Sequence, residues 1–169
     1  YSKGSSLLKM ILKWLGEETF IKGVSNYLKK HKWGNTKTSD LWESLAAVSG
    51  QDVVKVMDIW TKNIGYPVIT VKELAPGKIE VTQNRCLITG DATADEDKIL
   101  YPVFLGLRTL EGVNELLVLD GRSKVVEFTS KDDFFKINAD QSGIYRTAYE
   151  TERWTKLGKA GEDGKLSVE

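Results

Sequence analysis

The sequence is poor in the residues that build most catalytic centres. Among its 169 residues it has one cysteine, Cys86, and one histidine, His31. A single cysteine cannot form an intramolecular disulfide, so the chain is not a disulfide-stapled scaffold, and a reducing compartment is favoured. A single histidine is too few for most catalytic zinc sites, which use at least two histidines or thiolates that this chain lacks. We therefore expect neither a metal site nor a cofactor site within this chain.

The chain also lacks an excess of charge and a long hydrophobic run. Its 24 Lys and Arg residues balance 24 Asp and Glu residues, which gives no electrostatic reason to bind nucleic acid or an anionic membrane. No window approaches 18 uncharged apolar residues, so we expect no membrane segment. The chain begins with Tyr1 and shows no signal-peptide pattern, which indicates the middle of a longer polypeptide.

Residues 1–66 have the apolar spacing of amphipathic helices. Apolar side chains recur every three or four residues over 7–15, 20–28, 41–46 and 53–64, which predicts four helices. Residues 38–40 supply caps for the third helix, and residues 49–52 have capping-box spacing before the fourth. Gly65 and Pro67 end the last helix, because glycine suits the left-handed position after a helix and proline cannot continue it.

Residues 67–150 switch to a period of two and are rich in β-branched side chains. This pattern predicts about seven strands, with a Pro76-Gly77 turn, a Glu111-Gly112 turn and an Asp120-Gly121 hairpin signal between them. We expect a small antiparallel β-sandwich and therefore an α+β chain. A further helix is expected around Trp154 and Leu157, followed by a flexible linker over 158–164. The predicted strands are residues 68–71, 79–83, 103–107, 116–119, 125–128, 134–137 and 144–147.

Several residues that could carry chemistry have a simpler structural interpretation. His31 belongs to a cationic cluster at the end of a helix, and Cys86 is interpreted as a filler of β-structure. The acidic run 91–97 lacks EF-hand spacing and is interpreted as a solvated loop, and residues 120–123 are interpreted as a turn. Most of the tryptophans fall on apolar faces, which favours core packing. From the chemistry of its residues alone, the chain has no self-contained active site.

Five short segments, in order and in register, resemble the gluzincin zinc aminopeptidases, the group of aminopeptidase N and the puromycin-sensitive enzyme. The first is a Tyr-x-Lys-Gly segment at Tyr1, and the last spans residues 137–146; the resemblance covers essentially the whole chain. The sequences of these segments most resemble the puromycin-sensitive, cytosolic branch of the family, which implies a cytoplasmic protein. The other segments are residues 15–20 together with 27–31, residues 38–42, and residues 57–61 together with 65–68.

The resemblance implies a role for each part of the chain. Residues 1–66 resemble the last helices of the catalytic domain, 67–150 resemble the β-sandwich domain that follows it, and 151–169 resemble the entrance to a helical domain. Tyr1 matches the family's catalytic tyrosine, whose phenol donates a hydrogen bond to the oxyanion of the tetrahedral intermediate. The parent would be a zinc enzyme that removes N-terminal residues from peptides.

The family's zinc motif, H-E-x-x-H with a distant Glu, is missing here, as is the segment that anchors the substrate's amine. We expect this chain alone to bind no catalytic zinc and to hydrolyse nothing. Its partners would be the other domains of the same protein, and its exposed helix faces would favour self-association. The alternative is a non-catalytic helical and β-sandwich spacer or interaction module.

Overall fold

A computed structural model describes residues 1–130 and 133–166, except for the side chain of Asp91. The chain divides into two compact units, Tyr1–Ile64 and Gly65–Glu169. Helices form the first unit, while strands followed by a helix form the second. The expected α+β class is confirmed. Because the positions of the two units relative to one another are not determined, each is described by itself.

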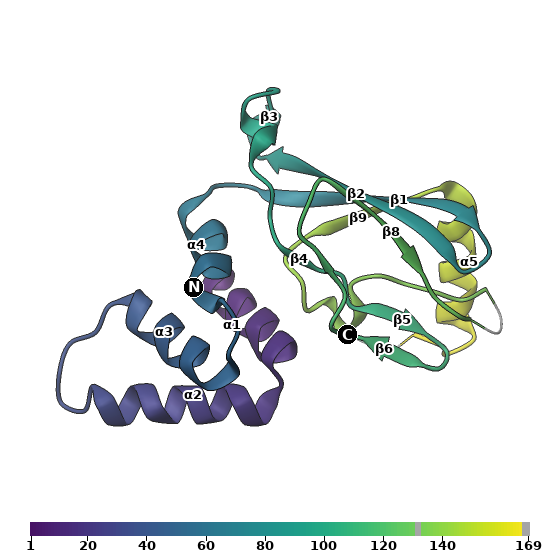
Figure 1. Cartoon of the computed structure of the whole chain (residues 1–169). Coiled ribbons are helices and arrows are strands. Elements are labelled where there is room, and N and C mark those ends of the chain that lie inside the picture. The colour runs from purple at the N-terminus through teal and green to yellow at the C-terminus, as the bar shows by residue number, and fades with distance from the viewer. Residues whose placement is uncertain (131–132, 167–169) are drawn as a thin grey trace. The chain divides into compact units, whose positions relative to one another are not determined.

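The first unit contains the four helices that the apolar spacing predicts. They are α1 (Ser2–Leu15), α2 (Glu17–Lys30), α3 (Thr38–Ser49) and α4 (Val53–Lys62), shown from purple to blue in Figure 1. Helices α2 and α3 approach closely at Gly23, where a Cβ would lie 2.6 Å from Leu45 Cδ2. The buried apolar side chains of this unit are Leu7, Met10, Ile11, Trp42, Leu45, Val53, Met57 and Trp60.

The helix starts use side-chain caps, although not always the expected ones. The Asp40 carboxylate accepts a hydrogen bond of 2.7 Å from the backbone N–H of Lys37, as expected for the region 38–40. Helix α4 is capped by Asp52, which accepts from the backbone N–H of Lys55 at 3.2 Å. Ser49 instead accepts from the N–H of Gln51 inside the preceding turn. The capping box predicted at 49–52 is therefore wrong, because the last residue of that segment is itself the cap.

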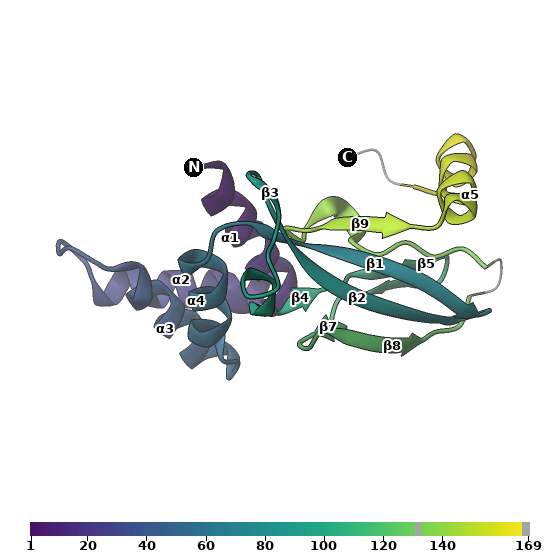
Figure 2. The ribbon, with the colours of Figure 1, turned by 90° about the horizontal axis from the view of Figure 1, so that it is seen from above.

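The second unit is built around two long strands, β1 (Tyr66–Ala75) and β2 (Lys78–Leu87), joined by the turn predicted at Pro76-Gly77. Strand β9 (Arg146–Tyr149) pairs with β1, while β3 (Gly90–Asp91) and β8 (Ser123–Glu127) pair with separate stretches of β2. Two ribbons complete the unit: β4 (Val103–Phe104) with β7 (Val118–Leu119), and β5 (Leu107–Thr109) with β6 (Gly112–Asn114). Figure 2 shows β1 and β2 crossing the unit lengthwise, with β9 along one side.

Several expectations about the strands need correction. Strand β9 runs parallel to β1, so the large sheet is mixed rather than purely antiparallel. The Asp120-Gly121 signal does not make a hairpin, because β7 pairs with β4 and β8 pairs with β2. The strand expected over 103–107 is split at Gly106, whose φ of 51° interrupts the extended backbone.

The strand expected over 134–137 is reduced to one bridge between Lys136 and Arg108. Asp133 and Asn138, on either side, have φ values of 53° and 58°. These left-handed conformations end an extended run at both sides. The last predicted strand, 144–147, is present but begins later, at Arg146.

The C-terminal helix α5 (Thr151–Glu162) runs through Gly158 and Gly161, where a flexible linker was predicted. Its side chains Arg153, Leu157 and Ala160 are buried. Leu157 and Ala160 pack with Phe134 in a small apolar cluster of their own. Tertiary packing therefore stabilises a helix that its glycines would weaken by about 1 kcal/mol each.

Candidate functional site

The site residue predicted from the sequence, Tyr1, lies at the start of α1. Its backbone carbonyl accepts the first hydrogen bond of that helix, 2.9 Å from the N–H of Ser5. Its side chain is fully exposed. The helical unit thus fixes the backbone beside Tyr1 and leaves the phenol open to solvent, where it can donate a hydrogen bond to a ligand.

His31 caps the end of α2 rather than forming a reactive pair. Its backbone N–H donates to the Tyr27 carbonyl, and the centres of the Tyr27 and His31 rings lie 5.5 Å apart. The imidazole Nε2 is buried and has no hydrogen-bond partner among the residues that the structure describes. The helix-end position agrees with the structural interpretation of this residue.

Cys86 lies on β2 opposite Tyr66 on β1, and its thiol is 3.6 Å from the Tyr66 hydroxyl. The thiol's hydrogen bond is the main reason that the pKa of Tyr66 lies above its ordinary value, with burial adding to the shift. The Arg146 guanidinium lies over the Tyr66 ring, 5.4 Å from its centre. Cys86 therefore takes part in a strand contact, as the interpretation of it as a filler of β-structure suggests.

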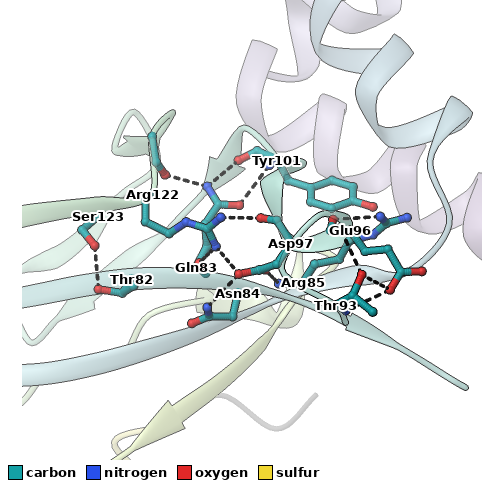
Figure 3. Close-up of polar contacts among 11 residues, drawn as sticks. Thr82, Gln83, Asn84, Arg85, Thr93, Glu96, Asp97, Tyr101, Arg122 and Ser123 are labelled. Atoms are coloured by element: carbon teal, nitrogen blue, oxygen red, sulfur yellow. Dashed lines mark hydrogen bonds and ion pairs between the residues drawn. The ribbon is translucent and has the colours of Figure 1, made fainter. Parts of the chain in front are cut away.

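The acidic run does more than form a solvated loop. Asp97, in a short 3-10 turn (η1, Glu96–Lys98), is the centre of the polar network in Figure 3. Arg122 donates from Nη1 to Asp97 Oδ2 at 2.8 Å and from Nη2 to its main-chain carbonyl. The backbone N–H of Arg85 and the amide of Asn84 donate to the same carboxylate. The interpretation as a solvated loop is therefore wrong for Asp97, while Asp95 stays exposed.

These contacts decide the charge state of Asp97. Burial alone raises its pKa, but the N–H of Arg85, the Asn84 amide and the Arg122 guanidinium outweigh burial, so that the pKa lies below its ordinary value. The residue is ionised at neutral pH. It holds the loop that follows β2 against the sheet through an ion pair with Arg122, which the sequence assigned only to a turn.

Gln83 completes this network from inside the sheet (Figure 3). It is 1% exposed, and its side chain spans two loops. Its Nε2 donates to the carbonyls of Tyr101 and Gly121 at 3.0 and 2.7 Å, and its Oε1 accepts from the N–H of Tyr101 at 2.9 Å. Buried amides of this kind stabilise a structure only when every polar atom is paired. Sequence reasoning missed Gln83, because a polar residue on a strand ordinarily faces solvent.

A second cluster joins α5 to the sheet. Arg153 is 1% exposed and forms a bidentate pair with Glu73 of β1, at 2.8 and 2.6 Å. It also donates to the Asp133 carbonyl at 2.6 Å, and its guanidinium lies 4.0 Å from the centre of the Phe135 ring. Lys156 adds an ion pair of 2.6 Å to Asp133. Sequence reasoning also missed this cluster, in which Arg153 and Glu73 are 80 positions apart in the chain.

The five tryptophans do not behave alike. Trp42 and Trp60 are buried, as the core interpretation predicts, and Trp14 is half-buried. Trp33 and Trp154 are 94% and 53% exposed, so core packing does not explain them. Trp154 makes an edge contact with the Tyr149 ring, at 5.3 Å between centres. Trp33 lies outside the helical runs of apolar residues, so the apolar spacing does not predict its exposed position.

Within the described ranges, no group of three His, Cys, Asp or Glu side chains is placed to hold a metal ion. The carboxylates of the two clusters are engaged by arginine and lysine, and His31 lies at the end of α2. The side chains present therefore do not fit a catalytic zinc ion. In the same part of the chain, no helix combines the length and the apolar character needed for a bilayer crossing.

Comparison with known proteins places these features in a family. Residues 1–60 match the peptidase family M1 domain. The whole chain is 73% identical to aminopeptidase 2 of Candida albicans and 59% identical to mitochondrial aminopeptidase 2 of Saccharomyces cerevisiae. The resemblance to the M1 aminopeptidases is confirmed. A third relative, the glutamyl aminopeptidase of Rattus norvegicus, is 40% identical over 91% of the chain.

This M1 segment is short beside its relatives. It spans 18%, 17% and 17% of the length of these three proteins. The similarity continues past the M1 match into the β-unit and α5, since the alignments with the two yeast enzymes cover all 169 residues. The comparisons therefore identify the chain as a segment of an aminopeptidase. The activity of the whole protein is proposed below.

Proposed function

We propose that this chain is part of a zinc-dependent aminopeptidase that removes N-terminal amino acids from peptides. The observation that carries the proposal is the 73% identity to aminopeptidase 2 over the complete chain. In this assignment, residues 1–66 are the last helices of the catalytic domain, 67–150 form the sandwich domain, and 151–169 lead into a helical domain. The match of residues 1–60 to the peptidase family M1 domain supports the first of these boundaries.

Tyr1 is the residue of this chain that we assign to catalysis. The resemblance of its Tyr-x-Lys-Gly segment to the family motif gives the role, and its exposed phenol on an ordered helix start makes the role physically possible. The phenol would donate a hydrogen bond to the oxyanion of the tetrahedral intermediate. A donor that is placed where negative charge develops lowers the barrier by about 3–4 kcal/mol.

The test is Tyr1→Phe in the complete polypeptide that carries this chain. We expect kcat for peptide hydrolysis to fall by about 100- to 1,000-fold with KM nearly unchanged, since the lost contact exists only in the transition state. Tyr27→Phe is the matched control, because its hydroxyl contacts Thr36 in the same unit. A kcat that Tyr1→Phe leaves at the level of this control would overturn the catalytic role.

The zinc ligands and the residues that bind the substrate amine would come from the rest of the polypeptide. The isolated chain is then inactive, and it self-associates through apolar side chains that stay exposed on its helices, such as Ile21 and Leu28. Zinc analysis, a peptide-hydrolysis assay and light scattering on the isolated chain test this directly. Bound zinc together with released amino acids would contradict it.

The proposed location is the cytoplasm. Two observations support it: the resemblance of the sequence motifs to the cytosolic branch, and the single cysteine. One relative is nevertheless named a mitochondrial enzyme. Imaging of the tagged complete polypeptide distinguishes the two compartments.

A further inference from the structure

The loop between α2 and α3 presents a tryptophan that the helical core does not use. Trp33 is 94% exposed, and its φ is 63°. A bulky side chain rarely adopts this left-handed conformation, because its Cβ then crowds the backbone. The loop therefore keeps a strained backbone and an exposed indole together, although neither contributes to the packing of the helices.

The surroundings of Trp33 are strongly basic. Residues 29–37 include four lysines and His31 but no acidic residue, in a chain whose total charge is zero. All four lysines are exposed. The Lys32 ammonium lies 5.4 Å from the centre of the Trp33 ring, close enough for a cation–π contact. The exposed indole thus has one ammonium group beside it and belongs to a segment of net positive charge.

A groove adjoins this loop. It has a volume of about 520 Å³ and lies between α2 and α3, where it is lined by Asn26, Lys29, Lys30, Glu43, Ser44 and Ala47. Lys29 and Lys30 belong to both the groove and the basic loop. Asn26 adds an amide that can bond to a peptide backbone or to a carboxylate.

The loop is ordered before any partner arrives. The Tyr27 hydroxyl bonds to the Thr36 hydroxyl at 2.7 Å, and the N–H of Gly34 donates to the His31 carbonyl at 3.0 Å. Figure 1 shows the loop projecting beyond the ends of α2 and α3. A loop that is already ordered loses little conformational entropy on binding, which favours affinity.

We propose that the basic loop 29–37 and the adjoining groove bind an acidic segment of a separate protein. Aspartate and glutamate side chains of the partner would pair with Lys29, Lys30 and Lys32, and one apolar side chain would pack on Trp33. Tryptophan is among the residues that contribute most to protein interfaces when it is surrounded by matching polar contacts. A membrane surface is disfavoured, because one indole on a compact loop lacks the broad apolar face of an interfacial helix.

The experiment uses the complete polypeptide and a fluorescein-labelled peptide of Asp and Glu residues with one central Leu. Fluorescence anisotropy should show saturable binding that weakens as salt is raised. Trp33→Gly should reduce the affinity by about 30-fold or more. Gly is chosen because it adopts the left-handed conformation without strain, so this variant keeps the fold. The double change Lys29→Glu with Lys30→Glu should reduce the affinity by about tenfold or more.

Two variants serve as matched controls. Lys55→Glu reverses an exposed charge on α4, and Trp154→Ala removes a half-exposed tryptophan of α5. Both should leave the affinity unchanged, with far-UV circular dichroism confirming the fold of every variant. The proposal is overturned if the peptide does not bind or if the controls lose as much affinity as the loop variants. It is equally overturned if vesicles containing phosphatidylserine bind through Trp33 while the peptide does not.

Discussion

Replacing Arg153 by methionine is the most direct test of how the second unit is held together. Methionine keeps most of the length and apolar volume of the side chain but removes the guanidinium. Arg153 is 1% exposed, whereas the side chains of Glu73 and Asp133 keep 29% and 42% of their exposure. The substitution therefore removes the fully buried charge and leaves two carboxylates that reach water in part.

The expected cost follows from these exposures. Removing one partner of a buried ion pair typically costs about 3–5 kcal/mol, because the other charge stays buried and unpaired. Water at Glu73 and Asp133 moves the value toward the lower end, and loss of the contact with Phe135 adds on the order of 1 kcal/mol. We expect a loss of about 4 kcal/mol in the free energy of unfolding. For a unit of roughly 100 residues this lowers Tm by about 16 °C or more.

Urea unfolding followed by tryptophan fluorescence measures this loss, since Trp154 lies on the helix that Arg153 holds. Arg146→Met is the matched control, because Arg146 is exposed and its guanidinium lies over the face of the Tyr66 ring. Its expected cost is below about 1 kcal/mol. Arg153→Lys should fall between the two, since lysine keeps the charge but cannot form the bidentate pair with Glu73.

A loss below about 1 kcal/mol for Arg153→Met would refute the reasoning, because the cluster would then contribute no more than a surface ion pair. Amide hydrogen exchange locates the effect. The amides of α5 should lose protection in Arg153→Met, and those of β2 should keep most of theirs.

Two further predictions concern an acidic group and a strained residue. The pKa of Asp97 is below its ordinary value, so its stabilising effect is complete above the unfolded pKa of about 3.9 and is lost as pH falls through the lower folded pKa. Asp97→Asn should therefore lower the free energy of unfolding by about 1–2 kcal/mol at neutral pH. It should also weaken the fall of that free energy as the pH is lowered, which urea titrations at several pH values measure. An unchanged dependence of the free energy of unfolding on pH would contradict this. Trp33→Gly should raise the free energy of unfolding by about 0.5–1 kcal/mol, because relief of the left-handed strain exceeds the entropy that glycine adds to the unfolded chain. A thermal melt measures this, and a lower Tm would count against the strain.

Local patterning determined the helices, the position of the first long hairpin and the family. Apolar spacing placed α1 to α4, and Pro76-Gly77 placed the turn between β1 and β2. These features depend on neighbours in the chain, which a sequence displays directly. The family motifs, including Tyr1 in its Tyr-x-Lys-Gly segment, are likewise local. They carried the assignment to the M1 aminopeptidases without any tertiary information.

Tertiary structure alone decided how the strands pair and which polar residues matter. The parallel pairing of β9 with β1 joins residues almost 80 positions apart, and no turn motif in the sequence predicts it. The two expected strands that failed are interrupted by left-handed residues such as Gly106 and Asn138, which hydrogen bonds from distant segments hold in place. Gln83, Asp97 and Arg153 were missed because a polar residue looks the same in a sequence whether water or another segment surrounds it. Its partner is chosen only when the chain folds, since burial makes an unpaired polar group costly and so makes the pairing specific.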